Sequence, residues 1–335
     1  MKLGFTRSEV DPNLYLKVEN DMPLILVLYV DDLFLTGDDP FIHQCKRESA
    51  SEFEMKDLGL MHYFLGLEVS QKPGEIFLSQ GKYIVKLLES CGMVDCKFVS
   101  TSMELNFKKL CGSAVGPELA NPSEYRQLFG ALMFLVNSCP DICFVVNNLS
   151  QFMVEPHHIH WIAAKNLLRY LWGTIHYGLR YTGGNFKLHG YLDADWASNV
   201  VYHKSTSGCC FSLGSASISW MSRKQKSVTL STVEAEYIFA SMACCEVVWL
   251  RKLFSELFEH VLDTTVIFCD NQSGIYLSEN PVFHGCSKHI DIRYHFIRDM
   301  VQRGAIRLQH IRADEQVTDI LAKSLEKVKF LTFRE

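Results

Sequence analysis

Four single carboxylates, each in a short motif beside a predicted strand or helix, constrain the C-terminal half of the chain most strongly. Asp193 lies in GYLDADWA, Glu236 in STVEAEY, Asp270 in VIFCDNQS and Asp319 in EQVTDILAK. The first and third close apolar, strand-like runs, and open α/β sheets place ligand sites at the C-terminal ends of their strands. Acids from four separate elements can converge only in a folded domain. Their plainest joint use is to hold two divalent cations.

Two glutamates lie near the start of the long predicted helix, and the helical repeat places them on different faces. Ser231 followed three residues later by Glu234 forms the pattern of a capping box. Glu236 lies about 200° further around a helix of 3.6 residues per turn, so the two glutamates cannot share a face. We therefore assign Glu234 to the cap and Glu236 to the site. Taken singly, such acids are more often caps or solvated charges, as we expect for Asp195 and Asp314.

Composition indicates a folded protein with reduced cysteines. The 335 residues are 48% hydrophobic, enough for two or three domains with real cores. The 12 cysteines include no CxxC pattern, which favours buried thiols of an intracellular protein. The first twelve residues do not follow the signal-peptide pattern, and the apolar run 24–30 is too short for a membrane span. We expect an intracellular protein, cytoplasmic or nuclear, without a membrane partner.

Charge is distributed unevenly, although the net charge is only −5. A local basic strip matters more for nucleic-acid binding than the overall balance. Residues 288–312 form one such strip, and Arg223, Lys224 and Lys226 form a second basic group that we expect in a loop. These three residues and Arg293 are our candidate contacts to a nucleic-acid backbone. The alternative for both groups is a solvated surface.

The order of elements predicts a β-rich start, a helical middle and a mixed α/β end. We expect, in order, a strand–turn–strand unit over 24–36, a helix over 41–53, a β section over 62–80, a helix ending before Gly92, a linker-like stretch over 100–123 and helices over 124–172. After residue 186 we expect strands, a helix over 233–257, a strand over 266–269, more helix, a strand over 306–311 and a final helix. This order fits a mixed sheet with flanking helices.

Two histidine groups could suggest a metal site, but the sequence gives them no ligand set. His157, His158 and His160 lead into a helix-like run without partner cysteines, so we expect solvated or capping side chains. His289 and His295 lie in KHIDIRYHF, and we assign them no role.

Ordered strings along nearly the whole chain resemble the C-terminal part of the Pol polyprotein of copia-type LTR retrotransposons. They include LGFTRSEVDPNLY, YVDDLFLTGDD, YRQLFGALMFL, GYLDADWA, STVEAEY, CDNQSGI and TDILAK. The resemblance implies a truncated reverse-transcriptase palm over 1–75, a thumb/connection segment over 76–185 and a ribonuclease H-like mixed β-sheet domain over 186–335. The family's ribonuclease H acids fall on Asp193, Glu236, Asp270 and Asp319.

The resemblance also implies a chemistry. Two Mg²⁺ ions, replaceable by Mn²⁺ and roughly 4 Å apart, would clamp the scissile phosphate of RNA in an RNA–DNA hybrid, with Asp193 bridging both. In YVDD, Asp31 and Asp32 would lie on a hairpin turn as polymerase metal ligands; an ordinary Asp-Asp turn is the alternative. The family's polymerase needs a further aspartate from an earlier strand, and neither Asp11 nor Asp21 ends one. We therefore expect an incomplete polymerase site.

Two functions of different classes follow from these patterns. One is a Mg²⁺-dependent ribonuclease H, acting with the rest of a Pol polyprotein on RNA–DNA hybrids. The other is a non-catalytic relic of a decayed element that at most binds nucleic acid. The intact acids favour the enzyme. Between Ile306 and Asp319 the glycine-flanked histidine loop of better-known ribonucleases H is missing, and we expect His310 within a strand instead.

Overall fold

A computed structural model describes residues 3–19, 22–103, 110, 116–184, 186–195, 204–226, 228–229, 232–258, 262–279 and 288–335. At 233, 277–279 and 288–294 it describes the backbone alone. The chain forms two compact units, one of residues 1–61 with 245–263 and one of residues 62–244 with 264–335.

The first unit contains an antiparallel sheet, a helix that follows the sheet, and the part of a long helix that lies after Cys244. Its sheet has the order β1-β2-β3-β4, and its elements are β1 (Thr6–Arg7), β2 (Leu14–Glu19), β3 (Met22–Tyr29), β4 (Asp32–Thr36) and α1 (Asp39–Glu52). The predicted hairpin is confirmed, because Tyr29 pairs with Asp32 around a turn of Val30 and Asp31. Val30 adopts φ 54°, a backbone region that is costly for a β-branched residue.

The second unit begins with a small antiparallel sheet of order β5-β6-β7-β8. Its strands are β5 (Tyr63–Phe64), β6 (Leu67–Lys72), β7 (Glu75–Ser79) and β8 (Gly178–Thr182). The predicted break at Pro73–Gly74 is the tight turn between β6 and β7, where Gly74 adopts φ 75°. The fourth strand, β8, comes from about a hundred residues later in the chain, and the sequence did not predict it.

Helices follow and build the main core of the second unit. They are α2 (Gly81–Ser90), α3 (Pro122–Leu135), the 3₁₀ turn η2 (Pro140–Ile142), α4 (Cys143–Ser150) and α5 (His158–Gly173). Fully buried leucines such as Leu132, Leu149 and Leu167 fill the space between them. The same cluster includes Leu321 and Phe330 near the C-terminus, so the helical segment and the last residues share one core.

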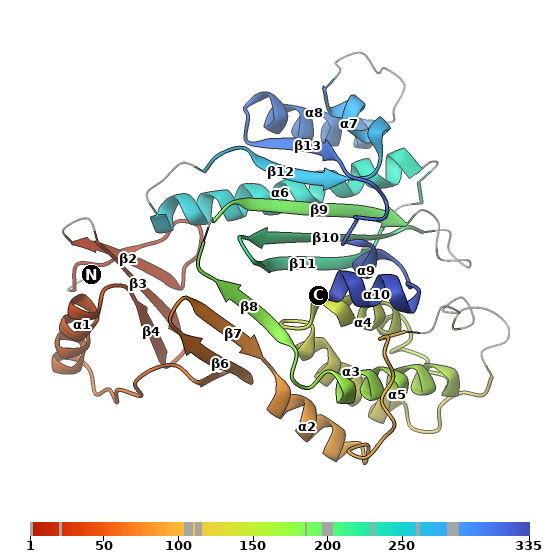
Figure 1. Cartoon of the computed structure of the whole chain (residues 1–335), viewed down its shortest axis with the longest axis horizontal. Helices are drawn as coiled ribbons and strands as arrows, with labels where there is room; N and C mark the ends of the chain where they lie inside the picture. The colour runs from red at the N-terminus through yellow and green to blue at the C-terminus, as the bar shows by residue number, and fades with distance from the viewer. Residues whose placement is uncertain are drawn as a thin grey trace. The chain divides into compact units, whose positions relative to one another are not determined.

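The second sheet of this unit has five strands in the order β11-β10-β9-β12-β13. Its strands are β9 (Leu188–Asp195), β10 (Thr206–Leu213), β11 (Ala216–Lys224), β12 (Thr265–Cys269) and β13 (Ile306–His310). β9, β10 and β11 are antiparallel neighbours, whereas β12 runs parallel to both β9 and β13. Figure 1 shows the five strands side by side. The predicted mixed α/β sheet is confirmed.

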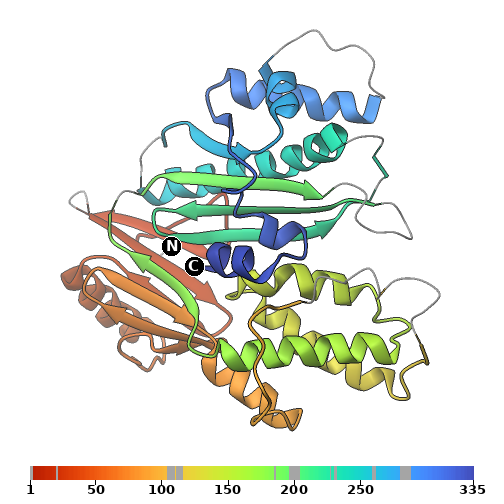
Figure 2. The ribbon, with the colours of Figure 1, turned by 45° about the vertical axis from the view of Figure 1, so that its right-hand side comes forward.

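Five helices accompany this sheet. They are α6 (Thr232–Phe258), α7 (Gln272–Glu279), α8 (Lys288–Gln302), α9 (Asp319–Ala322) and α10 (Lys327–Arg334). The part of α6 up to Cys244 belongs to this unit. α7 and α8 pack against each other and against β13, as Figure 2 also shows. α9 packs against the other three strands of the sheet, β9, β10 and β11.

The two compact units group the residues differently from the predicted segments 1–75, 76–185 and 186–335, which stay a prediction about the organisation of the sequence. Among the described residues, no helix combines the length and the apolar character that crossing a membrane requires.

Candidate functional site

Two of the four acids come from neighbouring parallel strands. Asp193 lies near the end of β9, the central strand, and only 4% of its surface is exposed. Asp270 directly follows β12, which runs parallel to β9. Parallel strands end at the same edge of a sheet, and this edge is where open α/β sheets bind ligands. The fold therefore brings these two carboxylates to one edge.

A buried glutamine places the third acid. The Gln225 Nε2 amide donates to Ser207 Oγ on β10 (2.8 Å) and to the carbonyl of Ala235 in α6 (2.7 Å). These bonds tie the first turns of α6 to the sheet, so the adjacent Glu236 reaches the site with 9% exposure. Glu234 is half-buried on the same helix. Ser231 lies outside the described residues, so the capping box stays a prediction.

The fourth acid, Asp319, opens the single turn of α9 and is 1% exposed. Gln316 Nε2 donates to the carbonyl of Leu192 (2.8 Å), which anchors the approach to α9 on β9. Gly208, the β10 residue paired with Asp193, lets α9 lie directly on the sheet. A Cβ at Gly208 would lie 2.6 Å from the Cβ of Leu321. A glycine opposite Asp193 thus allows Asp319 to approach it.

The pKa values of the buried acids show that all four share one electrostatic environment. Burial raises the pKa of Asp193 to about 7; the Lys323 charge opposes this rise, and the charges of Asp319 and Asp270 add to it. Burial likewise raises the pKa of Glu236 to about 8, against a hydrogen bond from Asn271 and with the charges of Asp270 and Asp193. The structure therefore brings the four predicted residues together.

Two lysines that the sequence reasoning missed neutralise part of this charge. Lys323 Nζ lies 2.7 Å from Asp319 Oδ1 and 3.4 Å from Asp193 Oδ2. Lys329 Nζ lies 2.5 Å from Asp319 Oδ2. The spacing of Asp319 and Lys323, four residues apart, is the signal that could have identified the first lysine. The charge of Asp195 also raises the pKa of Lys323, so this half-buried acid belongs to the surroundings of the site.

The acids outside the site and the histidines follow the expected pattern in part. Asp314 pairs with Arg312 on the exposed surface, as expected for a solvated charge. The His160 ring Nδ1 accepts from the backbone N–H of His157 (2.9 Å) and so caps α5, although His160 is buried rather than solvated. The side chain of His289 lies outside the described residues. His310 is the last residue of β13, as predicted.

The donor set fits a hard divalent cation in its chemistry. Its four predicted members offer oxygen alone, which Mg²⁺ prefers. Asp193 Oδ2 is buried and makes no hydrogen bond, although Lys323 Nζ lies 3.4 Å away. Within the described residues, no three His, Cys, Asp or Glu side chains are arranged closely enough to hold a metal ion directly. Lys323 contacts Asp193 and Asp319 in this arrangement, and their role as metal ligands stays a proposal.

The raised pKa values predict how the stability of the metal-free protein depends on pH. Because the folded state binds protons on Asp193 and Glu236 more tightly than the unfolded chain, the free energy of unfolding should fall as pH rises from about 4 to about 8. In EDTA, the melting temperature should be lower at pH 8 than at pH 5.5. Glu236→Gln should flatten this dependence. A wild-type melting temperature that does not fall over this range would contradict the assigned burial.

The predicted nucleic-acid contacts differ in their surroundings. Arg223 and Lys224 are the last residues of β11 rather than part of a loop, and Arg223 and Lys226 are exposed. Lys224 Nζ donates to Gln151 Oε1 (2.8 Å), so its ammonium is already engaged. The side chain of Arg293 on α8 lies outside the described residues. Their contact with nucleic acid stays a prediction.

In the first unit, the exposed Asp31 lies in the β3–β4 turn, whereas the exposed Asp32, predicted on that turn, is the first residue of β4 and pairs with Tyr29. Asp11 Oδ1 accepts from the backbone N–H of Asn13 (2.9 Å), which is the geometry of a turn residue. Asp21 lies outside the described residues. The incomplete polymerase site stays a prediction.

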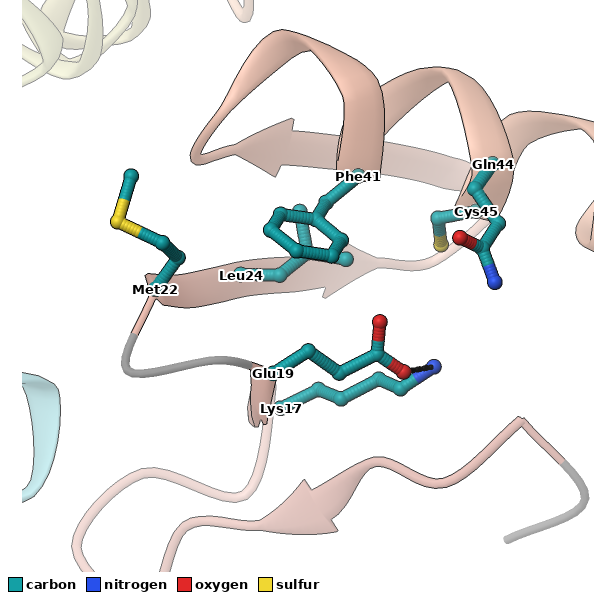
Figure 3. A pocket seen from close by; sticks show the side chains of 7 residues that line it. All are labelled: Lys17, Glu19, Met22, Leu24, Phe41, Gln44 and Cys45. Atoms are coloured by element: carbon teal, nitrogen blue, oxygen red, sulfur yellow. Dashed lines mark ion pairs between the residues drawn. The ribbon is translucent and has the colours of Figure 1, made fainter.

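A small cavity of about 10 Å³ lies elsewhere in this unit, as Figure 3 shows. Lys17 Nζ and Glu19 Oε1 form an ion pair at its wall (2.8 Å). The lining residues are Lys17, Glu19, Met22, Leu24, Phe41, Gln44 and Cys45. None of the predicted acids lines this cavity, which has room for about one water molecule.

Comparisons with known proteins agree with the fold and the motifs. The family described as reverse transcriptase (RNA-dependent DNA polymerase) matches residues 1–105. A retrovirus-related Pol polyprotein from transposon RE1 of Arabidopsis thaliana is 40% identical over 335 residues, which is 99% of this chain and 23% of that protein. A putative transposon Ty5-1 protein of Saccharomyces cerevisiae is 36% identical over 251 residues, covering 73% of this chain and 81% of that protein.

A solved structure shows the same fold. The foamy viral protease-reverse transcriptase, solved in complex with an RNA/DNA hybrid, aligns with 86% of this chain and 36% of its own at a TM-score of 0.51 and 12% identity. The fold and the sequence together define a reverse-transcriptase segment followed by a ribonuclease H-like domain. The chain belongs to the Pol polyproteins of copia-type transposons, and it spans about a quarter of the length of the RE1 relative.

Proposed function

We propose that this chain is a divalent-metal-dependent ribonuclease H that cleaves the RNA strand of RNA–DNA hybrids as part of a Pol product. The observation that carries the proposal is the cluster of carboxylates at one edge of the five-stranded sheet: Asp193, Glu236 and Asp319 are buried, and Asp270 at the end of β12 is half-buried. Burial, and after it the charges of neighbouring acids, raise the pKa values of Asp193 and Glu236, and strongly shifted pKa values cluster at functional sites. Membership of the Pol family supports the choice of substrate.

In this proposal Asp193, Glu236, Asp270 and Asp319 would hold two Mg²⁺ ions, which Mn²⁺ can replace. Such ions, when bound, supply an activated water and stabilise the leaving 3′ oxygen. The residues of the chain do the positioning. Asp193 comes from the central strand, and its buried Oδ2 atom makes no hydrogen bond, with Lys323 Nζ 3.4 Å away.

Asn271 holds the carboxylate of Glu236 in position. Its side chain hydrogen-bonds the Glu236 carboxylate, and its Oδ1 atom accepts from the N–H groups of Ser273 (2.9 Å) and Gly274 (3.2 Å) at the start of α7. A residue that caps one helix and holds the acid of another fixes the direction of Glu236. Geometry held this way by neighbouring groups is what a reacting site needs.

The exposed Arg223 and Lys226 are the proposed contacts to the backbone of the hybrid, together with Arg293. Phosphate contacts of this kind orient a duplex without reading its sequence. RNA would be distinguished from DNA by contacts to its 2′-OH groups in the minor groove.

The test is cleavage of a labelled RNA–DNA hybrid by the purified 335-residue chain in Mg²⁺ or Mn²⁺. We expect the RNA strand to be cut, the DNA strand to stay intact, and EDTA to stop the reaction. Single-stranded RNA and double-stranded DNA of the same sequence are the matched controls. A folded chain that cuts no hybrid in either metal would exclude the proposal and leave the alternative of a relic that binds hybrids without cleaving them.

A further inference from the structure

Lys323 contacts the two most deeply buried acids of the site. Its Nζ atom lies 2.7 Å from Asp319 Oδ1 and 3.4 Å from Asp193 Oδ2. The lysine side chain is 35% exposed, whereas the Asp193 and Asp319 side chains are 5% and 1% exposed. The ammonium group therefore reaches from a half-exposed position into a buried acidic pair.

The local chain geometry explains this reach. α9 is a single turn from Asp319 to Ala322, and Lys323 is the residue that ends it. Its backbone N–H donates to the carbonyl of Asp319 (3.0 Å), which brings both side chains to the same face of the turn. The four-carbon stem of lysine is flexible, so its head group can leave the site without any backbone movement.

The physical need for a cation at this place is strong. Two carboxylates that are buried side by side repel each other, and low dielectric surroundings increase this repulsion. Asp193 and Asp319 lie close enough together for the one ammonium group of Lys323 to contact both carboxylates. An ammonium within 4 Å of both groups offsets the repulsion, and a divalent cation between them would do the same.

We infer that Lys323 is a positioning residue that serves as a built-in cation: it holds Asp193 and Asp319 together in the metal-free protein and is displaced by a divalent ion, so that it sets the metal affinity of the site. The inference rests on the proposed function, because it takes these acids as metal ligands. It goes further by assigning the control of metal affinity to one lysine.

Lys329 supplies a matched control. It also contacts Asp319, at Oδ2, but among the ion pairs of the described residues none joins it to Asp193. Its ammonium is further held by the carbonyl of Ala313 (3.1 Å) and lies 5.1 Å from the centre of the Phe333 ring. The contacts with Ala313 and Phe333 hold Lys329 independently of the acidic pair, so Lys329 has a structural role that Lys323 does not share.

The experiment compares the full chain as wild type, Lys323→Met, Lys323→Arg and Lys329→Met. Mn²⁺ binding is measured by electron paramagnetic resonance, and melting temperature is measured with and without Mn²⁺. Without metal, Lys323→Met should melt below wild type, because the acids lose their counter-charge. It should bind Mn²⁺ about tenfold more tightly, because no ammonium has to be displaced.

Two further readouts separate this role from general support of the fold. Lys323→Met should reach half-maximal hybrid cleavage at a lower Mg²⁺ concentration than wild type, and Lys323→Arg should restore the wild-type metal dependence. Lys329→Met should lower the melting temperature with and without Mn²⁺ alike. If Lys323→Met does not fold without metal, Mn²⁺ should recover it; failure of this recovery while Lys323→Arg folds would overturn the inference.

The experiment distinguishes failure of the inference about Lys323 from failure of the proposed ribonuclease function. Mn²⁺ binding by wild type that Asp270→Asn weakens, with Lys323→Met binding no more tightly than wild type, overturns the inference and leaves the proposed function standing. Tighter binding by Lys323→Met without hybrid cleavage by any variant supports the inference about the site and overturns the activity. Absence of Mn²⁺ binding in both wild type and Lys323→Met overturns both.

Discussion

Asp270→Asn should abolish hybrid cleavage and at the same time stabilise the metal-free protein. The change removes a proposed metal ligand at the end of β12, and loss of one group that stabilises transition-state charge costs on the order of 10²–10³-fold or more in rate. It also removes a charge that raises the pKa values of Asp193 and Glu236. We therefore expect a higher melting temperature in EDTA and a smaller gain from Mg²⁺. Cleavage rates and melting curves of the same preparation measure both effects.

Glu234→Gln is the matched control for Glu236→Gln, because both residues lie in α6. It carries the same chemical change two residues before Glu236, on a different face of α6. We expect cleavage within a few-fold of wild type, whereas Glu236→Gln should lose it as Asp270→Asn does. If Glu234→Gln is inactive and Glu236→Gln is active, the helical phase that we assign to α6 is wrong.

Gly208→Ala should destabilise the protein. The added Cβ would lie 2.6 Å from the Cβ and 2.9 Å from the carbonyl carbon of Leu321. One of these atoms is backbone, so α9 must move away from β10, at a cost of roughly 1–3 kcal/mol. Asp319 moves with α9, and cleavage should fall as well. Denaturant unfolding and the hybrid assay measure the two losses.

Gly130→Ala provides the comparison for this change. Gly130 lies inside α3, and nothing lies within 4 Å of the position that its Cβ would take. Alanine in an open helix interior should stabilise the protein by about 1 kcal/mol and leave cleavage unchanged. Equal stability of Gly208→Ala and wild type would show that α9 does not pack on β10 as described.

The sequence predicts those parts of the fold whose signals are local. The β3–β4 hairpin follows from two apolar runs around Val30 and Asp31, and the turn at Pro73–Gly74 follows from its turn residues. β8 shows the limit. Its five residues, Gly178–Thr182, pair with β7. Nothing in its own sequence indicates that its partner strand lies about a hundred positions earlier.

The site divides in the same way. Each of the four acids stands beside a strand or at a helix start, so its position could be predicted from neighbouring residues. The groups that hold them could not. Gln225 and Gln316 are buried amides whose hydrogen-bond partners lie on other elements. The sequence alone does not show whether a glutamine is buried. Lys323 was recognisable only by assuming that Asp319 begins a helical turn.

The shared core of the second unit has a consequence for the order in which the protein is made. Leucines of α2–α5 bury themselves in one cluster with Leu321, Leu325 and Phe330. A ribosome releases the helices first and those last residues more than a hundred positions later. Until residues 321–330 have been made, part of the apolar surface of these helices stays uncovered, and such surfaces are where chaperones bind and nascent chains associate.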